Sequence, residues 1–308
     1  MNDTMPTSPL PRTDADKLLK RATYASVATA ALLIVTKTIA WIMTGSVSVL
    51  ASLLDSLMDA GASLVNLLAV RYSLMPPDDE HRFGHGKTES VAGLAQATFI
   101  AGSGVFLLLE AVDRLIKPVP VEEVAVGVSV MVFAIIVTLL LVSYQHYVIR
   151  RTGSTAIKAD ALHYKTDLLV NAAIIVSLLL STYGWGGVDP LFAMAIGGYI
   201  LYSAWQIGIE AFHQLIDREL PDEQRGQIEQ LIASHPEVCG FHDLRTRLSG
   251  RTEMIQLHLE MDDDLPLVQA HAIAEEVEAS IKQRFPHADV VIHQDPVSIV
   301  ESLAGKSP

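Results

Sequence analysis

The chain has 308 residues, of which 50% are hydrophobic and only 19% are charged, whereas typical soluble domains are near 25% charged. Its formal net charge is −13, and residues 217–308 carry −10 of it, with 18 acids against 8 bases. These values predict an apolar membrane half and an acidic soluble half, which argue against nucleic acid as a partner and suit cations. The single Cys239 excludes an internal disulfide and a thiolate-rich zinc cluster.

Residues 1–22 are polar and contain three prolines followed by basic side chains. We expect this segment to be a disordered cytoplasmic tail. No short apolar stretch with a small-residue cleavage site follows it, so no cleaved signal peptide is predicted.

Six apolar segments come next, and each is long enough to cross a bilayer as a helix, which takes about 20 mostly apolar residues. Gly and Pro punctuate the stretches between them. We therefore expect residues 23–214 to form a six-helix transmembrane domain. The expected helices cover residues 24–43, 46–70, 90–116, 122–148, 157–183 and 188–213.

Lys and Arg are unevenly distributed among the loops. Ten lie in the N-terminal tail, the 71–89 loop and the 150–158 loop, and the other loops hold two. Because cytoplasmic loops carry an excess of Lys and Arg, this count predicts that both termini are cytoplasmic.

Residues 217–300 are predicted to form a small cytoplasmic α+β domain, metallochaperone-like, in the order α-β-β-α-β, and residues 301–308 a tail. A domain of this size is marginal alone, so a dimer partner or a bound metal is expected to stabilise it. The expected elements are a helix at 222–234, strands at 238–248 and 253–261, a helix at 267–285 and a strand at 289–293.

Two pairs of side chains in the membrane half are candidate metal ligands. Asp55 and Asp59 are four residues apart, so on a helix they share one face. A charge at mid-bilayer costs about 2.5–3.5 kcal/mol, and such residues usually face a cavity and are functional. His163 and Asp167 repeat the spacing, and the two pairs together would give a divalent cation four ligands. Nitrogen and oxygen donors suit Zn²⁺, and also Fe²⁺, Co²⁺ or Mn²⁺.

Each pair also has a structural interpretation. Asp55 and Asp59 could be hydrogen-bonded acids of a buried soluble helix, which the apolar composition of the rest of the chain disfavours. His163 and Asp167 could lie in the headgroup zone, since the uncharged run starts only at Leu168.

With these motifs the chain resembles the cation diffusion facilitator family, and most closely its bacterial zinc/ferrous-iron efflux branch. The resemblance covers about residues 20–298 and includes both membrane pairs. The stretches that carry it are Gly45-Ser46 through Leu54-Asp55-Ser56, Phe83-Gly84-His85-Gly86-Lys87, Leu162-His163-Tyr164 and His293-Gln294-Asp295-Pro296.

The resemblance implies a transporter rather than an enzyme, in the bacterial cytoplasmic (inner) membrane. It implies that Asp55, Asp59, His163 and Asp167 form the transport site of a homodimer that exports Zn²⁺, or Fe²⁺ or Cd²⁺, against protons by alternating access. Metal ligands must be deprotonated, so metal and protons compete. With an unperturbed pKa near 6.5, His163 is our hypothesis for the main proton-coupling residue.

The resemblance also implies metal sites outside the membrane segments. Asp78, His81 and His85 match a loop site, for which a solvated polar loop is the alternative. In the C-terminal domain five residues would hold two zinc ions with a structural or regulatory role, and Asp295 would bridge them. His242 and His258 would bind one ion and His271 and His293 the other.

One ion pair and two competing functions complete the predictions. Lys87 and Asp217 are both expected at the cytoplasmic membrane face, where a salt bridge could join the two halves. An intramembrane metalloenzyme would need a motif such as His-Glu-x-x-His, which is absent from the sequence. A membrane-anchored metal sensor would not need acids inside the membrane. The sequence leaves the physiological metal and the proton stoichiometry open.

Overall fold

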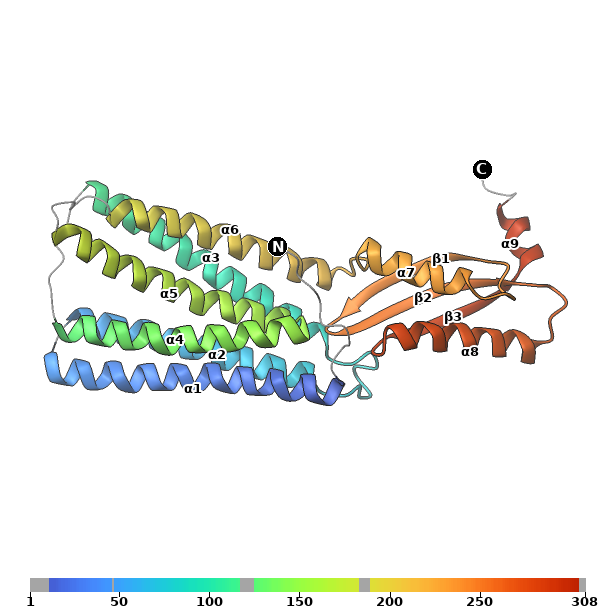
Figure 1. The fold of residues 1–308 in the computed structure, drawn as a ribbon, viewed down its shortest axis with the longest axis horizontal. Coiled ribbons are helices and arrows are strands. Elements are labelled where there is room, and N and C mark those ends of the chain that lie inside the picture. The colour runs from blue at the N-terminus through green and yellow to red at the C-terminus, as the bar shows by residue number, and fades with distance from the viewer. Residues whose placement is uncertain (1–10, 46, 117–124, 183–188, 305–308) are drawn as a thin grey trace. The chain divides into compact units, whose positions relative to one another are not determined.

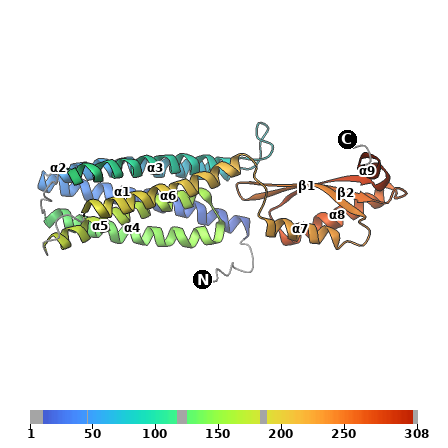
Figure 2. The same cartoon turned by 90° about the horizontal axis from the view of Figure 1, so that it is seen from above.

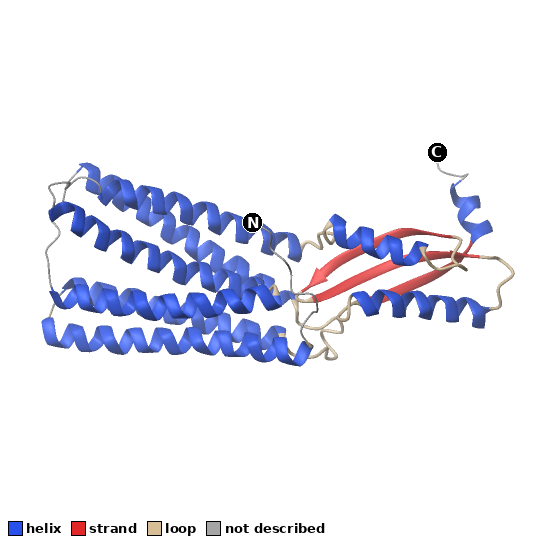
Figure 3. Ribbon diagram, viewed as in Figure 1, coloured by secondary structure: helices blue, strands red, loops and turns tan. Residues whose placement is uncertain are grey.

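The computed structural model describes residues 11–45, 47–116, 125–182 and 189–304. They divide into two compact units, residues 1–212 and 213–308 (Figure 1). The described part of the first unit is helical, and the second combines helices with a sheet (Figure 3). This confirms the predicted fold class.

The six expected membrane helices are all present. Within the described residues, five of them, α1 to α4 and α6, are long and apolar enough to cross a membrane by length and composition. α5 has a comparable length of 28 residues, and its first half carries four charged side chains. The helices are α1 (Arg12–Thr44), α2 (Val47–Ser73), α3 (Lys87–Ile116), α4 (Ala125–Thr152), α5 (Thr155–Thr182) and α6 (Asp189–Leu215).

The prediction of a disordered tail over residues 1–22 is wrong for its second half. α1 begins at Arg12, eleven residues before the expected domain boundary. Ala15, Leu19 and Ala22 lie on one helical face and are buried, and Leu19 and Ala22 pack in a cluster with Val70 of α2. This apolar stripe accounts for the helix, whereas residues 1–10 lie outside the described residues.

Two apolar clusters hold the first unit together, and α5 contributes to both. One cluster joins the start of α1, the end of α2, the end of α4 and the start of α5, and it includes Leu19, Val148 and Ile157. The other joins α3, α5 and α6 through residues such as Leu162 and Ile200. Figures 1 and 2 show the resulting bundle of long, roughly parallel helices. α5 therefore lies where its side chains can meet those of most other helices.

The second unit follows the predicted order of α-β-β-α-β, with one further helix at its end. β1 begins two residues later than expected and ends one residue later, β2 begins one residue earlier, and β3 extends to Pro296 instead of residue 293. The elements are α7 (Asp222–Ala233), β1 (Gly240–Ser249), β2 (Thr252–Met261), α8 (Leu267–Arg284), β3 (Asp289–Pro296) and α9 (Val297–Ala304).

The sheet has the strand order β1-β2-β3, with β1 antiparallel and β3 parallel to β2. α7 and α8 cover one face, where Leu257 and Leu259 of β2 are buried with Ile228 and Val277. Because side chains alternate along a strand, His258 and its neighbours two residues away point to the other face. That face is only partly buried, so polar groups there remain accessible.

Candidate metal sites

The first group of candidate ligands lies inside the helix bundle. His163 Nε2 on α5 is 3.1 Å from Asp59 Oδ1 on α2 and 3.9 Å from Asp167 Oδ2. Ligand atoms of these three residues all lie within 4.8 Å of one another. We call Asp59, His163 and Asp167 the membrane site. It brings together three of the four residues predicted from the sequence.

The surroundings of the membrane site are largely apolar and helical. The His163 side chain is only 6% exposed, against 15% for Asp59 and 29% for Asp167. The ring of Phe99 on α3 meets the imidazole edge-on, with 6.1 Å between ring centroids. In such a setting an ion would exchange water for these nitrogen and oxygen donors.

Asp55, the fourth predicted ligand, is not among the three residues that the structure groups. It lies one turn before Asp59 on α2, and its residue is exposed. Lys37 of α1 reaches this turn of α2, where its Nζ donates to the Ser52 carbonyl at 3.0 Å and to Ser56 Oγ at 2.6 Å. The role of Asp55 as a ligand stays a prediction.

The loop between α2 and α3 carries a second group. Asp78 Oδ1 is 3.3 Å from His81 Nδ1, and Asp78 Oδ2 is 3.3 Å from His85 Nε2. We call these three residues the loop site. The backbone N–H of His81 donates to Asp78 at 2.6 Å, and this hydrogen bond holds the pKa of the Asp78 carboxyl below its usual range. The carboxylate is therefore available as a ligand at neutral pH.

The third group lies on the open face of the sheet, where strand register aligns three histidines. His242 of β1 is opposite His258 of β2, which is opposite His293 of β3. Adjacent rings are 4.9 and 4.7 Å apart between centroids. Asp295 lies beside this row, with 2.7 Å from its Oδ2 to His258 Nδ1 and 3.5 Å to His242 Nε2.

His293 completes this group, since its Nε2 is 3.3 Å from Asp295 Oδ1. We call His242, His258, His293 and Asp295 the sheet site. The fifth predicted residue, His271, is exposed on α8, and its Nε2 is 3.4 Å from Glu275. Among the described residues it forms an ion pair with Glu275 and not with Asp295, so its role as a ligand stays a prediction.

Glu260 borders the sheet site, and the sequence analysis missed it. Its Oε1 is 2.9 Å from His242 Nδ1, which leaves Nε2 of that ring directed toward Asp295. The residue opposite Glu260 is Gly240, where a Cβ would come within 2.5 Å of the Glu260 carboxylate. The spacing of His258 and Glu260 matches that of His293 and Asp295, and this repeat is the signal that could have identified it.

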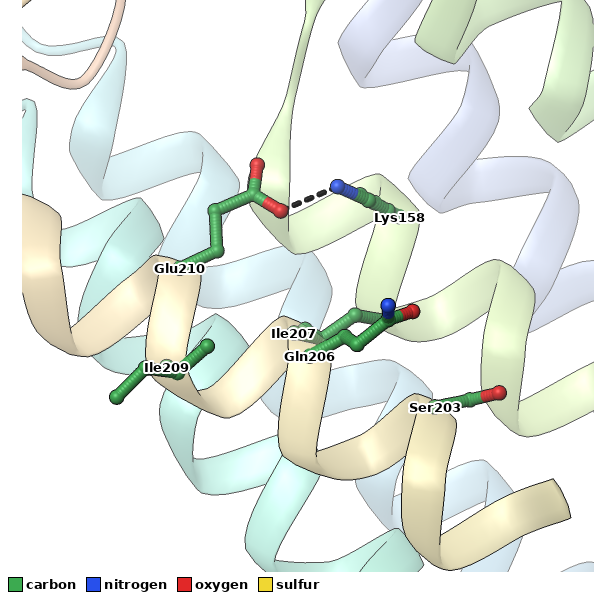
Figure 4. A pocket seen from close by; sticks show the side chains of 6 residues that line it. All are labelled: Lys158, Ser203, Gln206, Ile207, Ile209 and Glu210. Atoms are coloured by element: carbon green, nitrogen blue, oxygen red, sulfur yellow. Dashed lines mark hydrogen bonds and ion pairs between the residues drawn. The ribbon is translucent and has the colours of Figure 1, made fainter.

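One pocket described in the structure is separate from all three groups. It measures about 450 Å³ and lies between α5 and α6 (Figure 4). Lys158 of α5 forms an ion pair with Glu210 of α6 at its rim. No residue of the three sites lines it, and we assign it no ligand.

The predicted salt bridge between Lys87 and Asp217 would join the two units, and it stays a prediction. Within its own unit, Asp217 Oδ1 lies 3.1 Å from Arg247 Nη1.

Comparisons with known proteins match most of this chain. Residues 23–216 match the cation efflux transmembrane domain, and residues 220–297 match the cytoplasmic domain of cation efflux proteins. The cation-efflux pump FieF of Escherichia fergusonii is 56% identical over 284 residues, which cover 92% of this chain and 95% of that protein. FieF of Escherichia coli (strain K12 / DH10B) gives the same identity and coverage.

Among solved structures, CzrB in its zinc form is 30% identical and covers 27% of this chain and 94% of its own, with a TM-score of 0.26. The C-terminal domain of MamM is 21% identical and covers 24% of this chain and 96% of its own, with a TM-score of 0.24.

Proposed function

Because the chain belongs to the cation efflux family and is a multi-pass membrane transporter of that family, we propose that it exports a divalent metal ion in exchange for protons. Zn²⁺ is the proposed main cargo, with Fe²⁺ and Cd²⁺ as further substrates. The cargo binds at the membrane site, completed by Asp55.

The observation that carries this proposal is the position of His163 between two carboxylates inside the bundle, 3.1 Å from Asp59 and 3.9 Å from Asp167. One imidazole with carboxylates suits a borderline divalent ion such as Zn²⁺. The charged groups are costly in a bilayer, so a function that uses them explains their presence better than a purely structural role.

Exchange with protons follows from the chemistry of the same ligands. A metal ion binds the deprotonated imidazole and carboxylates, so its entry releases protons and protonation releases it. His163 is the proposed main coupling residue, because a free imidazole titrates near pH 6.5, close to the pH of cells. Alternating access then requires only that the site faces one side when it binds metal and the other when it binds protons.

The cytoplasmic domain is proposed to bind zinc as a resident ion and, together with the membrane domain, to form the interface of a homodimer. The sheet site fits this metal, since imidazole nitrogens and the Asp295 oxygens are ordinary zinc donors. Three of its residues, His242, His258 and Asp295, have ligand atoms within 4.8 Å of one another. His271 joins a second ion with His293 in this proposal. Such a site would report cytoplasmic metal. Both termini are proposed to be cytoplasmic, which the excess of Lys and Arg in the loops on that side supports, and the protein is proposed to lie in the inner membrane.

The loop site is proposed to capture metal on its way to the membrane site. It offers three ligands, Asp78, His81 and His85, and two of these residues are exposed. An incomplete set of protein ligands leaves coordination positions to water, which suits transient binding.

Transport in proteoliposomes tests the function directly. Purified full-length protein is reconstituted with a pH reporter inside the vesicles and exposed to Zn²⁺, Fe²⁺, Cd²⁺ and Mn²⁺. We expect metal uptake with matching proton release for wild type and none for Asp59→Ala. Asp14→Ala, which removes an exposed carboxylate at the start of α1, is the control and should transport normally. Metal binding without flux in wild type would favour a sensor instead.

A further inference from the structure

A carboxyl group outside the three metal sites is completely buried in the bundle. Asp160 lies on α5, one turn before His163, and its residue is 0% exposed. Its Oδ2 accepts a hydrogen bond from Ser26 Oγ of α1 at 2.6 Å and one from Gln145 Nε2 of α4 at 2.7 Å. These two partners are neutral groups of α1 and α4, and the buried Asn66 of α2 also interacts with the carboxyl.

The hydrogen bonds continue from Asp160 to a fourth helix. Gln145 Nε2 also donates to Ser26 Oγ at 3.1 Å. The hydroxyl of Tyr164, the residue after His163, donates to the Ser26 carbonyl at 3.1 Å and lies 2.8 Å from Ser63 Oγ of α2. We call Ser26, Ser63, Gln145, Asp160 and Tyr164 the polar clamp. Each of its members is at most 1% exposed.

The polar clamp holds the same two helix segments that carry the membrane site. Ser63 follows Asp59 by one turn of α2, and Asp160 and Tyr164 flank His163 on α5. A shift of either helix that separated Asp59 from His163 would therefore also strain the clamp. The hydrogen bonds that Asp160 accepts from Ser26 of α1 and Gln145 of α4 also hold α5 in its position.

Ordinary helix packing does not account for this arrangement. A buried carboxylate is costly, and apolar side chains of similar volume often hold packed elements at least as well. Among the described residues, Asp160 Oδ1 and Gln145 Oε1 are buried with no hydrogen-bond partner within 3.5 Å, so their burial adds a cost that apolar side chains would avoid. Buried polar networks instead select one relative arrangement of the elements that they join.

We propose that Asp160 is a positioning residue of the transport reaction, which sets α5 so that His163 faces Asp59. This inference rests on the proposed role of the membrane site. Loosening the clamp widens the range of ligand geometries, which weakens binding of the cargo and reduces discrimination between metals. A loss of folded protein would act differently, because it would lower the maximal rate for every metal in equal proportion.

The test compares two replacements of Asp160 in reconstituted full-length protein. Asp160→Leu removes both hydrogen bonds and keeps the branched skeleton of the side chain, and we expect KM for Zn²⁺ to rise about tenfold, as when groups that orient metal ligands are removed. The preference for Zn²⁺ over Mn²⁺ should fall by a similar factor. Asp160→Asn keeps an oxygen that can accept from Ser26 and Gln145, so its KM should stay within about twofold of wild type.

Double variants distinguish the clamp from general destabilisation. Ser26→Ala should add little to the effect of Asp160→Leu, because both break the same network, and changes within one network are not additive. Thr23→Val is the matched control, since Thr23 is also buried on α1 but bonds only to the Lys20 carbonyl of its own helix. Its effect should be small and additive.

The outcomes separate this inference from the proposed function. If Asp59→Ala abolishes transport while Asp160→Leu lowers only the maximal rate, the positioning role of Asp160 is wrong and the proposed transport site is supported. If Asp59→Ala transports normally, the transport site itself is wrong. An Asp160→Asn variant as impaired as Asp160→Leu would also overturn positioning, because its hydrogen bonds are retained. Should Asp160→Leu not fold, Gln145→Leu with Ser26→Ala gives the same test.

Discussion

The membrane site and the sheet site use the same donor atoms in opposite settings. In the membrane site, two helices bring one histidine and two aspartates together, and the His163 side chain is 6% exposed. In the sheet site, three strands align His242, His258 and His293 on an open face, where the His293 side chain is 64% exposed. The donor chemistry therefore does not distinguish the two sites; their backbone supports do.

The backbone supports of the two sites differ in the contacts that join their elements. The sheet site depends on backbone hydrogen bonds of a three-stranded ladder, in which a shift by one residue would turn every side chain to the other face. The membrane site depends on side-chain contacts between α2 and α5, and no ladder of backbone hydrogen bonds joins the described parts of these two helices. A site that must bind and release metal in each cycle fits the second support, and a site that retains a resident ion fits the first.

The largest effect is expected from changing the donor atom in the membrane site. His163→Asp replaces nitrogen by oxygen, which favours harder ions such as Mn²⁺ over Zn²⁺. We expect Zn²⁺ transport efficiency to fall on the order of 100-fold, more than most changes to groups around a metal, with fewer protons released per metal ion. Zinc binding at the sheet site should not change.

Vesicle flux with an internal pH reporter measures both quantities, and His146→Asp, an exposed position on α4, is the matched control. Unchanged zinc flux and proton coupling in His163→Asp would contradict the proposed role of His163 in the membrane site.

The converse change is Asp295→Ala in the sheet site. Asp295 is within 3.5 Å of all three histidines of the row, so its loss should weaken zinc binding there by more than tenfold. Transport at saturating metal should fall less than threefold. Zinc titration of the full-length protein against a chromophoric chelator measures the first quantity, and Asp289→Ala, at the start of the same strand, is the control. A total loss of transport would show that the two sites are not separable.

A smaller effect is expected from the residue that orients His242. Glu260→Gln removes the carboxylate that lies 2.9 Å from His242 Nδ1, and second-layer changes of this kind cost about tenfold in metal affinity at the lower limit. The same chelator competition detects it, with Glu237→Gln as an exposed control. Equal affinities for Glu260→Gln and wild type would mean that strand register alone orients the ring.

Sequence periodicity predicted the features that lie within one element. The i, i+4 spacing of His163 and Asp167 and the alternation of His293 and Asp295 needed only the geometry of a helix or a strand. Contacts between elements were less accessible. Asp55 shares a face with Asp59 by spacing, yet its residue is exposed. The sequence analysis did not single out Asp160, and only the packing of α1 and α4 against α5 shows that it is buried.

The smallest expected effect concerns the end of the sheet site. β3 continues directly into α9, and Asp263, in the loop before α8, accepts a hydrogen bond from the Ser298 backbone N–H at 3.0 Å. Hydrogen bonds from Ser298 hold the pKa of the Asp263 carboxyl below its usual range. The contribution of this contact to stability is thus complete above the pKa of an unfolded Asp, about 3.9, and is lost as the pH falls through the lower folded value.

Asp263→Asn should therefore lower the protection of α9 amides from hydrogen exchange at pH 7 and abolish the further loss of protection near pH 3. Zinc affinity of the sheet site should fall less than about threefold, since the strand ladder remains and an exposed contact of this kind is worth little. Asp264→Asn, in the same loop, is the control and should leave exchange in α9 unchanged. A tenfold loss of zinc affinity in Asp263→Asn would show that the sheet site is supported by this contact as well as by its register, which would make its support more like that of the membrane site.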